Sequence, residues 1–167
     1  WLGDGAFYDC ASLRALYVPA SATLQDEFVS TSAYLLHGCT SMKVLSIGGP
    51  SEPVIYHDMF SYKMLYNDTL ETVIINEGVT TIDSNAFDHG FYALKNISLP
   101  STLKTIGAYA FDNCSSLQHL VLPDGITSID PNAFYRCNAF QSVSSNTYNA
   151  VIAEFAEANN LTYTWDE

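Results

Sequence analysis

The sequence has few basic residues and no long hydrophobic run, and both absences narrow its range of partners. It carries 6 Lys and Arg against 18 Asp and Glu in 167 residues, a formal net charge of −12. A field of this sign repels a phosphate backbone, so nucleic acid is not an expected partner. No apolar stretch reaches the roughly 20 residues that a membrane helix needs. We therefore expect no membrane insertion within this chain.

Motifs of catalysis and of metal or cofactor binding are also absent. The sequence contains no Cys-x-x-Cys, His-Glu-x-x-His or Gly-x-Ser-x-Gly motif, no phosphate loop and no Asp-x-Asp-x-Asp-Gly calcium loop. Ser101 and Lys104 fit a Ser-x-x-Lys pattern, but the equivalent columns of the next repeat hold Asp124 and Thr127. That match reflects a variable turn. We predict no enzyme activity, no cofactor and no metal site.

What the sequence does have is a repeat. The motif Ala-Phe-x-x-Cys recurs at Ala6, Ala110 and Ala133, and a large apolar residue stands six places after each phenylalanine. This apolar landmark is found in six units, with spacings of 29, 28, 24, 23 and 23 residues, at Leu13, Met42, Leu70, Leu94, Leu117 and Phe140. The period falls in the range of leucine-rich repeats, so we predict a stack of about six units of roughly 23 residues.

Each unit is predicted to contribute one short strand to a parallel stack. Apolar residues stand three and five places after the landmark, for example Leu120 and Leu122 after Leu117. Side chains alternate along a strand, so these two share the buried face and the residues between them point to the opposite face. A Pro, Gly or Asn then ends the strand.

The second leg of each coil is predicted to be a return path without a strand. It begins at Ile82, Ile106 and Ile129 in the regular units, and the phenylalanine column follows five residues later. We expect the Ala-Phe pair to form a short helical turn that places the ring under the next coil.

One ordered set of motifs covers the regular part of the chain. It reads Leu99-Pro100, Ile106-Gly107, Ala110-Phe111, Cys114, Leu117, Leu120 and Leu122-Pro123. This order resembles the BspA-type leucine-rich repeat of secreted and surface proteins from host-associated bacteria and some protists. The resemblance is specific over about residues 70–145 and looser over 1–69. It implies a right-handed solenoid, extracellular display, and adhesion or protein binding without catalysis by the repeat itself.

We expect a single leucine-rich-repeat domain over residues 1–167, with irregular repeats in 1–69, regular repeats in 70–145 and a cap in 146–167. In the irregular part, residues 24–36 have helical apolar spacing, and residues 60–70 contain a tyrosine-rich insertion. In the cap, Val151, Ile152 and Phe155 predict a helix that Asn146 or Thr147 caps, followed by a strand over 161–165. Because the chain starts inside a repeat, we expect it to be a piece of a longer protein.

The four cysteines share one column of the repeat. Cys10 and Cys39 lie on neighbouring coils, as do Cys114 and Cys137. Stacked strands lie about 4.8 Å apart, which is within the Cα range of a disulfide, but parallel side chains keep the Cβ atoms farther apart than the preferred ~3.8 Å. We expect free, buried thiols, and two disulfides are the alternative.

Two regions are candidates for a binding surface. The first is the solvent face of the predicted sheet, which is mostly uncharged and edged by a basic column. Its candidate residues are Arg14, Tyr17, Lys43, Val44, Ile74, Lys95, His119 and Val121. The second is the insertion, with Tyr56, Tyr62 and Tyr66 as interface anchors. Strand formation also favours β-branched residues, and tyrosines can pad an irregular coil, so a structural role is the alternative for both regions.

The residues and the resemblance together predict a non-catalytic extracellular binding module of a surface or secreted protein, used for adhesion or protein–protein interaction. Its partner would be an extracellular or host protein, or a glycan. The alternative is a structural spacer or a targeting module attached to another functional domain.

Overall fold

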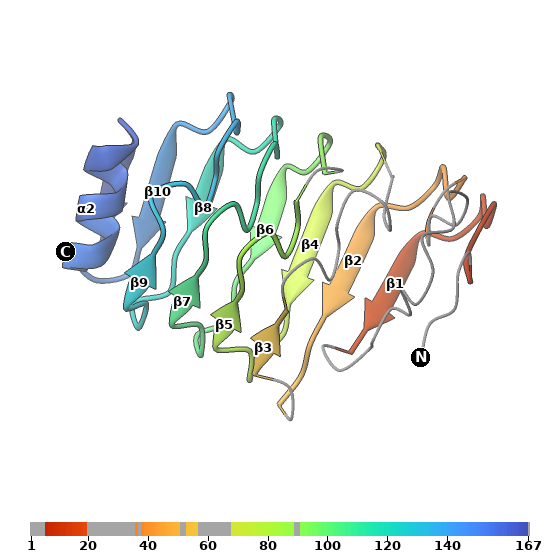
Figure 1. Ribbon diagram of the computed structural model, residues 1–167, viewed down its shortest axis with the longest axis horizontal. Coiled ribbons are helices and arrows are strands. Elements are labelled where there is room, and N and C mark those ends of the chain that lie inside the picture. Colours follow the sequence, from red (N-terminus) through yellow and green to blue (C-terminus); the bar gives the residue numbers. More distant parts are fainter. Residues whose placement is uncertain are drawn as a thin grey trace.

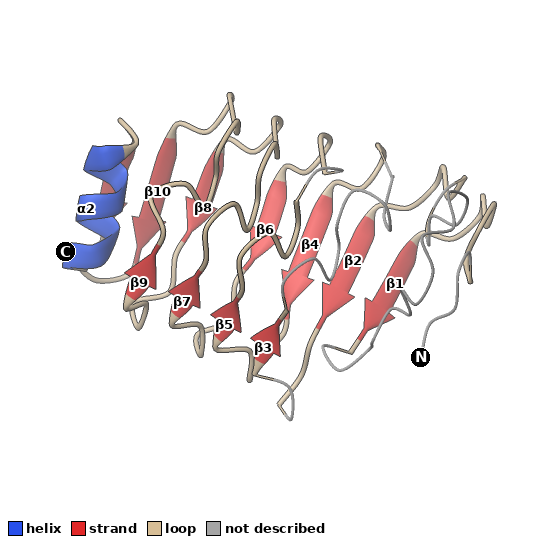
Figure 2. Ribbon diagram, viewed as in Figure 1, coloured by secondary structure: helices blue, strands red, loops and turns tan. Residues whose placement is uncertain are grey.

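The computed structural model describes residues 6–19, 36, 38–50, 53–56, 68–88 and 91–166. In these residues the chain winds into coils that stack along one axis (Figure 1). Short parallel strands form two rows along the stack, and a helix lies at its C-terminal end (Figure 2). The predicted leucine-rich-repeat solenoid of parallel strands with a C-terminal helix and strand is confirmed.

The long row holds one strand from each coil and a last strand from the cap. Its strands are β1 (Ala15–Val18), β2 (Val44–Ile47), β4 (Thr72–Ile75), β6 (Asn96–Ser98), β8 (His119–Val121), β10 (Ser142–Ser145) and β11 (Thr162–Trp165). Equivalent columns stand side by side, so that Leu45 lies opposite both Leu16 and Val73. Each strand lies where the apolar spacing placed it, which confirms the column alignment.

The short row is a second parallel sheet that the sequence interpretation missed. It consists of β3 (Val54–Ile55), β5 (Thr81–Ile82), β7 (Thr105–Ile106) and β9 (Ser128–Ile129), paired in that order. The isoleucines that were expected to begin a return path without strands therefore lie in two-residue strands. The four coils that carry these strands therefore have parallel strands on both sides of the core.

The long row is interrupted at one boundary between described strands. One set of ladders joins β1, β2, β4 and β6, and a separate set joins β8, β10 and β11. β6 and β8 are neighbours in the stack (Figure 1), but within residues 91–166 no ladder joins them. We call this boundary the seam. On the other side of the same two coils, β7 pairs with β9, and the Phe111 N–H donates to the Ala133 carbonyl at 2.8 Å.

The phenylalanine column forms the centre of the core. The Phe111 ring stacks between Phe87 at 4.9 Å and Phe134 at 5.1 Å, and all three are buried. The preceding residues form hydrogen-bonded turns instead of the expected helical turns. Asn85 and Tyr109 adopt the left-handed conformation, with φ of 55° and 57°, which reverses the chain before a helix can propagate.

The C-terminal cap is the predicted helix and strand, with one correction. Helix α2 (Ala150–Ala158) begins after Asn149, whose side-chain oxygen accepts from the Val151 and Ile152 N–H groups, so neither Asn146 nor Thr147 is the N-cap. The Asn149 amide also donates to two carbonyls of the preceding coil, which ties the helix start to the stack. Phe155 and Ile152 then cover the end of the core.

The four cysteines form no disulfide in the structure, and their burial differs along the chain. Cys39, Cys114 and Cys137 are buried, whereas Cys10 is exposed, contrary to the expectation that all four are buried. The Cys137 thiol donates to the Phe111 carbonyl at 3.1 Å. A hydrogen bond with Cys137 and burial together raise the pKa of Cys114 well above its ordinary value. The buried cysteines of this column therefore contribute to the packing of the core.

Two expectations fall largely outside the described residues. Of the helix expected over 24–36, only Leu36 is described, and it is buried in the core. Of the insertion over 60–70, only residues 68–70 are described.

Candidate functional site

The solvent-facing side of the long row, which we call the outer face, carries the first set of candidate residues. Side chains alternate between core and solvent along each strand, as in β8, where Leu120 is buried and His119 and Val121 are exposed. Tyr17 is 57% exposed and Val121 is 55% exposed, and Val44 and Ile74 are partly exposed between them. The structure therefore brings Tyr17, Val44, Ile74, His119 and Val121 onto one face, as predicted from their columns.

The expected basic column is instead a ladder of alternating charge. Glu71 lies between two lysines, with Lys43 Nζ at 2.6 Å from one carboxylate oxygen and Lys95 Nζ at 3.5 Å from the other. The hydrogen bond from Lys43 and the charge of both lysines lower the pKa of Glu71. Arg14 precedes them in the same column, and its carbonyl accepts from the Lys43 N–H. The edge of the outer face is thus less positive than the lysines and arginine alone suggest.

Of the second candidate region, the structure describes Tyr56. This residue follows β3 in the short row, where it is 61% exposed, on a different side of the coil from the outer face. Tyr62 and Tyr66 lie outside the described residues. Tyr56 is therefore not part of the outer face.

Polar side chains on the C-terminal half of the outer face contact those of the neighbouring coil. The ring nitrogens of His119 lie 2.9 Å from Ser142 Oγ and 3.1 Å from Ser144 Oγ, both on β10. Asn96 Nδ2 lies 3.5 Å from Thr72 Oγ1 on β4. This half of the face presents hydroxyl, amide and imidazole groups, whereas Tyr17 belongs to the more apolar N-terminal half.

Sequence reasoning missed two carboxylates at the ends of the strands. Glu77 accepts from the Ser101 N–H at 2.9 Å and from Ser101 Oγ at 3.0 Å, and Asp124 accepts from the Thr147 N–H at 2.9 Å. These hydrogen bonds, from the backbone of Ser101 and of Thr147 first, lower the pKa of both carboxyl groups. The four residues share one column, in which an acid alternates with a hydroxyl residue, and that alternation is the signal that could have revealed the pairs.

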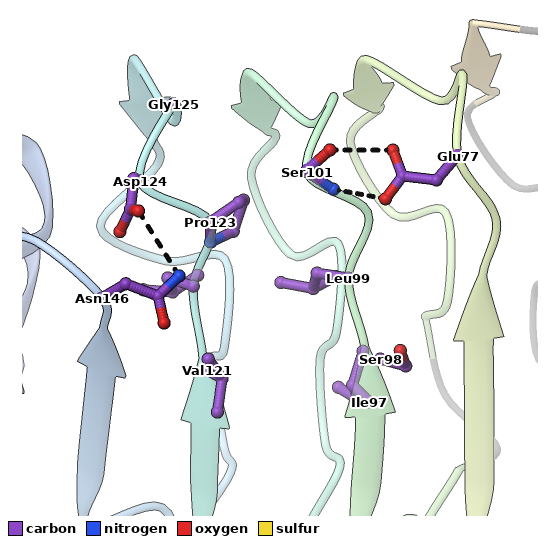
Figure 3. Close-up of a pocket in the computed structure, with 11 residues that line it drawn as sticks. Glu77, Ile97, Ser98, Leu99, Ser101, Val121, Pro123, Asp124, Gly125 and Asn146 are labelled. Atoms are coloured by element: carbon purple, nitrogen blue, oxygen red, sulfur yellow. Dashed lines mark hydrogen bonds between the residues drawn. The ribbon is translucent and has the colours of Figure 1, made fainter.

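The two carboxylates flank a hollow of about 550 Å³. Figure 3 shows the Glu77–Ser101 pair on one side and Asp124 with Asn146 on the other, with Leu99 pointing into the space between them. The Asn146 amide lies 3.4 Å from the second Asp124 oxygen. The hollow is open to solvent and acidic at its rim.

Among the described residues, no group of three or more His, Cys, Asp or Glu side chains is placed to hold a metal ion. Within the described residues, the His119 ring contacts two serine hydroxyls and no carboxylate. The described part of the chain also contains no helix with the length and apolarity of a membrane span.

Comparison with known proteins gives a family and several related folds. The chain matches the family model for the BspA type leucine-rich repeat region (6 copies) over residues 1–90 and 58–163. A leucine-rich repeat protein from Eubacterium ventriosum is similar at 28% identity and a TM-score of 0.51, over 88% of this chain and 34% of that one. A leucine-rich cell surface protein from Faecalibacterium prausnitzii is similar at 24% identity and a TM-score of 0.51, over 87% and 42%.

A third similar structure is the pneumococcal vaccine antigen PcpA, at 18% identity and a TM-score of 0.52, over 80% of this chain and 39% of that one. The chain thus spans about a third to two fifths of the length of these solved relatives. No curated protein matches it.

Proposed function

The chain belongs to the BspA-type leucine-rich repeat family, and on that premise we propose that it is a non-catalytic binding module that recognises a protein through its outer face. A leucine-rich repeat solenoid presents an extended strand surface suited to macromolecular partners. Display outside the cell or on its surface, and a role in adhesion, are parts of the same proposal. They rest on the family assignment.

One observation carries this proposal: the outer face is uncharged in a strongly acidic protein. The columns that face solvent on β1, β2, β4, β6, β8, β10 and β11 contain no Asp, Glu, Lys or Arg, although the chain has 18 acids. Depletion of charge at the centre, exposed aromatic and aliphatic groups such as Tyr17 and Val121, and a charged rim are typical of protein interfaces. Lys43, Glu71 and Lys95 supply that rim.

The experiment is a binding screen of the chain against extracellular-matrix proteins and glycans. Variants of the chain are then tested for binding to each partner that the screen finds. Tyr17→Asp with Ile74→Asp should abolish the interaction, because two charges would be buried in an apolar contact. The matched control is Tyr109→Asp with Tyr135→Asp, which changes two exposed tyrosines next to the phenylalanine column, one two residues before Phe111 and one directly after Phe134. Undiminished binding by the first variant would rule out the outer face, and the absence of any partner would favour a spacer role.

A further inference from the structure

The polar side chains on the strands that flank the seam bond to the coils beyond it. On one side, Lys95 and Asn96 lie against Glu71 and Thr72 of the preceding coil, at 3.5 Å in each case. On the other side, His119 reaches the two serines of β10 in the following coil. The polar side chains that flank the seam at the starts of β6 and β8 are thus turned away from it. Beyond the strands, the same boundary is crossed by Ser115 Oγ, which donates to the Tyr92 carbonyl at 3.4 Å, and by Lys104 Nζ, which donates to the Gly125 carbonyl at 3.0 Å.

The ends of the same strands repeat this arrangement. Ser101, which follows β6, bonds back to Glu77, and Asp124, which follows β8, bonds forward to Thr147. The column therefore pairs the third coil with the fourth and the fifth with the sixth. Between Ser101 and Asp124, at the seam, the described residues contain no such bond. Figure 3 shows the resulting space between the two pairs.

The backbone is open at the same boundary. At the other described boundaries, the residue after the landmark is tied to its neighbour, as where the Lys95 N–H donates to Glu71 at 3.0 Å and the Gln141 N–H donates to Gln118 at 2.9 Å. The corresponding bond from the Gln118 N–H to the Lys95 carbonyl is absent within the described residues. An N–H group and a carbonyl are thereby left for another hydrogen-bonding partner.

Two hollows of opposite electrostatic character lie at the two ends of the seam. The hollow at the strand starts, of about 590 Å³, is lined by Lys95, Asn96, Gln118 and His119 and by no acid. The hollow at the strand ends is the one flanked by the Glu77 and Asp124 carboxylates. Between them lies the neutral, partly apolar stretch of Ser98 and Val121, the latter 55% exposed.

We propose that the seam is a groove for an extended peptide segment of a partner protein that carries an acidic residue near Lys95 and a basic residue near Asp124. The inference rests on the proposed function and names its partner chemistry. From Lys95 to Ser101 is six residues, or roughly 20 Å at 3.3 Å per residue. An extended peptide along the strands would therefore place its two charges about six residues apart. Its backbone would lie on the outer face along the seam, beginning at the open Gln118 N–H and Lys95 carbonyl.

The charges distinguish a peptide from a glycan. A neutral oligosaccharide would gain nothing from the opposite charges at the two ends. An acidic oligosaccharide would gain from Lys95 but would be repelled by Glu77 and Asp124. A segment with one charge of each sign satisfies both ends, and the exposed Val121 offers an apolar contact at its centre.

The test is to pan a displayed library of random linear peptides against the chain and to sequence the enriched peptides. We expect an acidic and a basic residue about six positions apart. The Lys95→Glu, Asp124→Lys double variant should bind an enriched peptide about tenfold more weakly, because both charge contacts become repulsive. It should prefer the same peptide with its two charged residues exchanged.

Two further variants separate loss of the groove from loss of the fold. Arg14→Glu with Glu154→Lys makes the same charge exchange at exposed positions away from the seam, on the first coil and on α2, and should leave peptide binding unchanged. Ser98→Tyr keeps every charge and adds bulk at an exposed position beside the seam, so it should also weaken binding. Thermal melting of each variant checks that the coils remain folded.

Three results would overturn the proposal. One is enrichment of peptides without the charge pair, and another is equal binding by the double variant. The third is tight binding of an acidic oligosaccharide such as oligogalacturonate that depends on Lys95 and not on Asp124. If the Tyr17→Asp, Ile74→Asp variant loses a protein partner that the seam variants retain, the proposed function stands and the groove is rejected.

Discussion

The fourth and fifth coils meet differently on their two sides. One side, which we call the inner side, consists of the short row and the buried phenylalanine column, and the other is the outer face of the long row. Around the seam, the inner side is continuous: β7 pairs with β9, and the Phe111 ring stacks against Phe134 at 5.1 Å. On the outer face, β6 and β8 are neighbours without a ladder. At this boundary, the coils are therefore joined through the short row and the buried columns, and not through a ladder of the long row.

The inner side contributes more to stability than the outer face, because rings of its phenylalanine column are completely buried. Phe87 and Phe111 are fully buried, and each contributes far more apolar area to the core than any outer-face residue. A single outer-face hydrogen bond adds only about 0.5–1.5 kcal/mol to stability. Loss of a ladder at one boundary is thus small beside loss of one ring from the core.

The largest loss of stability is expected when a ring is removed from the inner side. Phe111→Ala should lower the free energy of unfolding by about 3–5 kcal/mol, because it leaves a cavity between Phe87 and Phe134. Denaturant unfolding followed by circular dichroism measures the loss. Val121→Ala on the outer face is the control and should cost less than about 0.5 kcal/mol. Similar losses for the two variants would show that the outer face also holds the stack together.

A smaller loss of stability is expected at Gly107, where two coils approach each other closely through their backbones. A Cβ added at Gly107, next to β7, would lie 2.6 Å from the backbone nitrogen of Ser84 in the preceding coil, so Gly107→Ala should cost about 1–3 kcal/mol. Gly125→Ala is the matched control. Its Cβ would meet only the end of the Lys104 side chain, at 2.5 Å, and that flexible group can move away.

Thermal melting of the two glycine variants decides the point. A clear drop in Tm for Gly107→Ala beside an unchanged Tm for Gly125→Ala would place the close approach of the coils on the short-row side. Equal melting temperatures would mean that the coils can separate there without cost.

The long row and its two faces could be read from the sequence because each strand carries several apolar columns in register. Leu45 and Ile47 are buried where the spacing places them, and the cap helix follows from Ile152 and Phe155. The short row could not be read in the same way. A two-residue strand such as β7 is too short to show alternation, and a lone isoleucine is equally consistent with a turn.

The sequence predicted the column and the coil of each candidate residue, but it did not predict which side chains contact one another. Alignment placed Lys95 and His119 on adjacent coils, but the sequence does not say which neighbour each side chain contacts. Whether His119 leans toward β10 or across the seam depends on shifts of a few ångströms between coils. The N-cap shows the same limit, since Asn146, Thr147 and Asn149 all have capping side chains and only the geometry selects Asn149.

The smallest expected effect is the most direct test of the seam itself. The amide of Gln118 lacks the bond across the seam, whereas the amides of Lys95 and Gln141 donate to the preceding coil at 3.0 Å and 2.9 Å. After correction for local sequence, we expect hydrogen exchange at Gln118 to be roughly fivefold faster than at Gln141, which corresponds to the loss of one hydrogen bond of about 1 kcal/mol.

Heteronuclear NMR of the labelled chain resolves these three amides in one experiment. Lys95 and Gln141 act as internal controls, because they occupy the same column one coil before and one coil after Gln118. Protection of Gln118 equal to that of Gln141 would mean that the seam closes in solution, and the groove would then lose its backbone groups. Fast exchange that becomes slow when an enriched peptide is added would instead place the peptide at the seam.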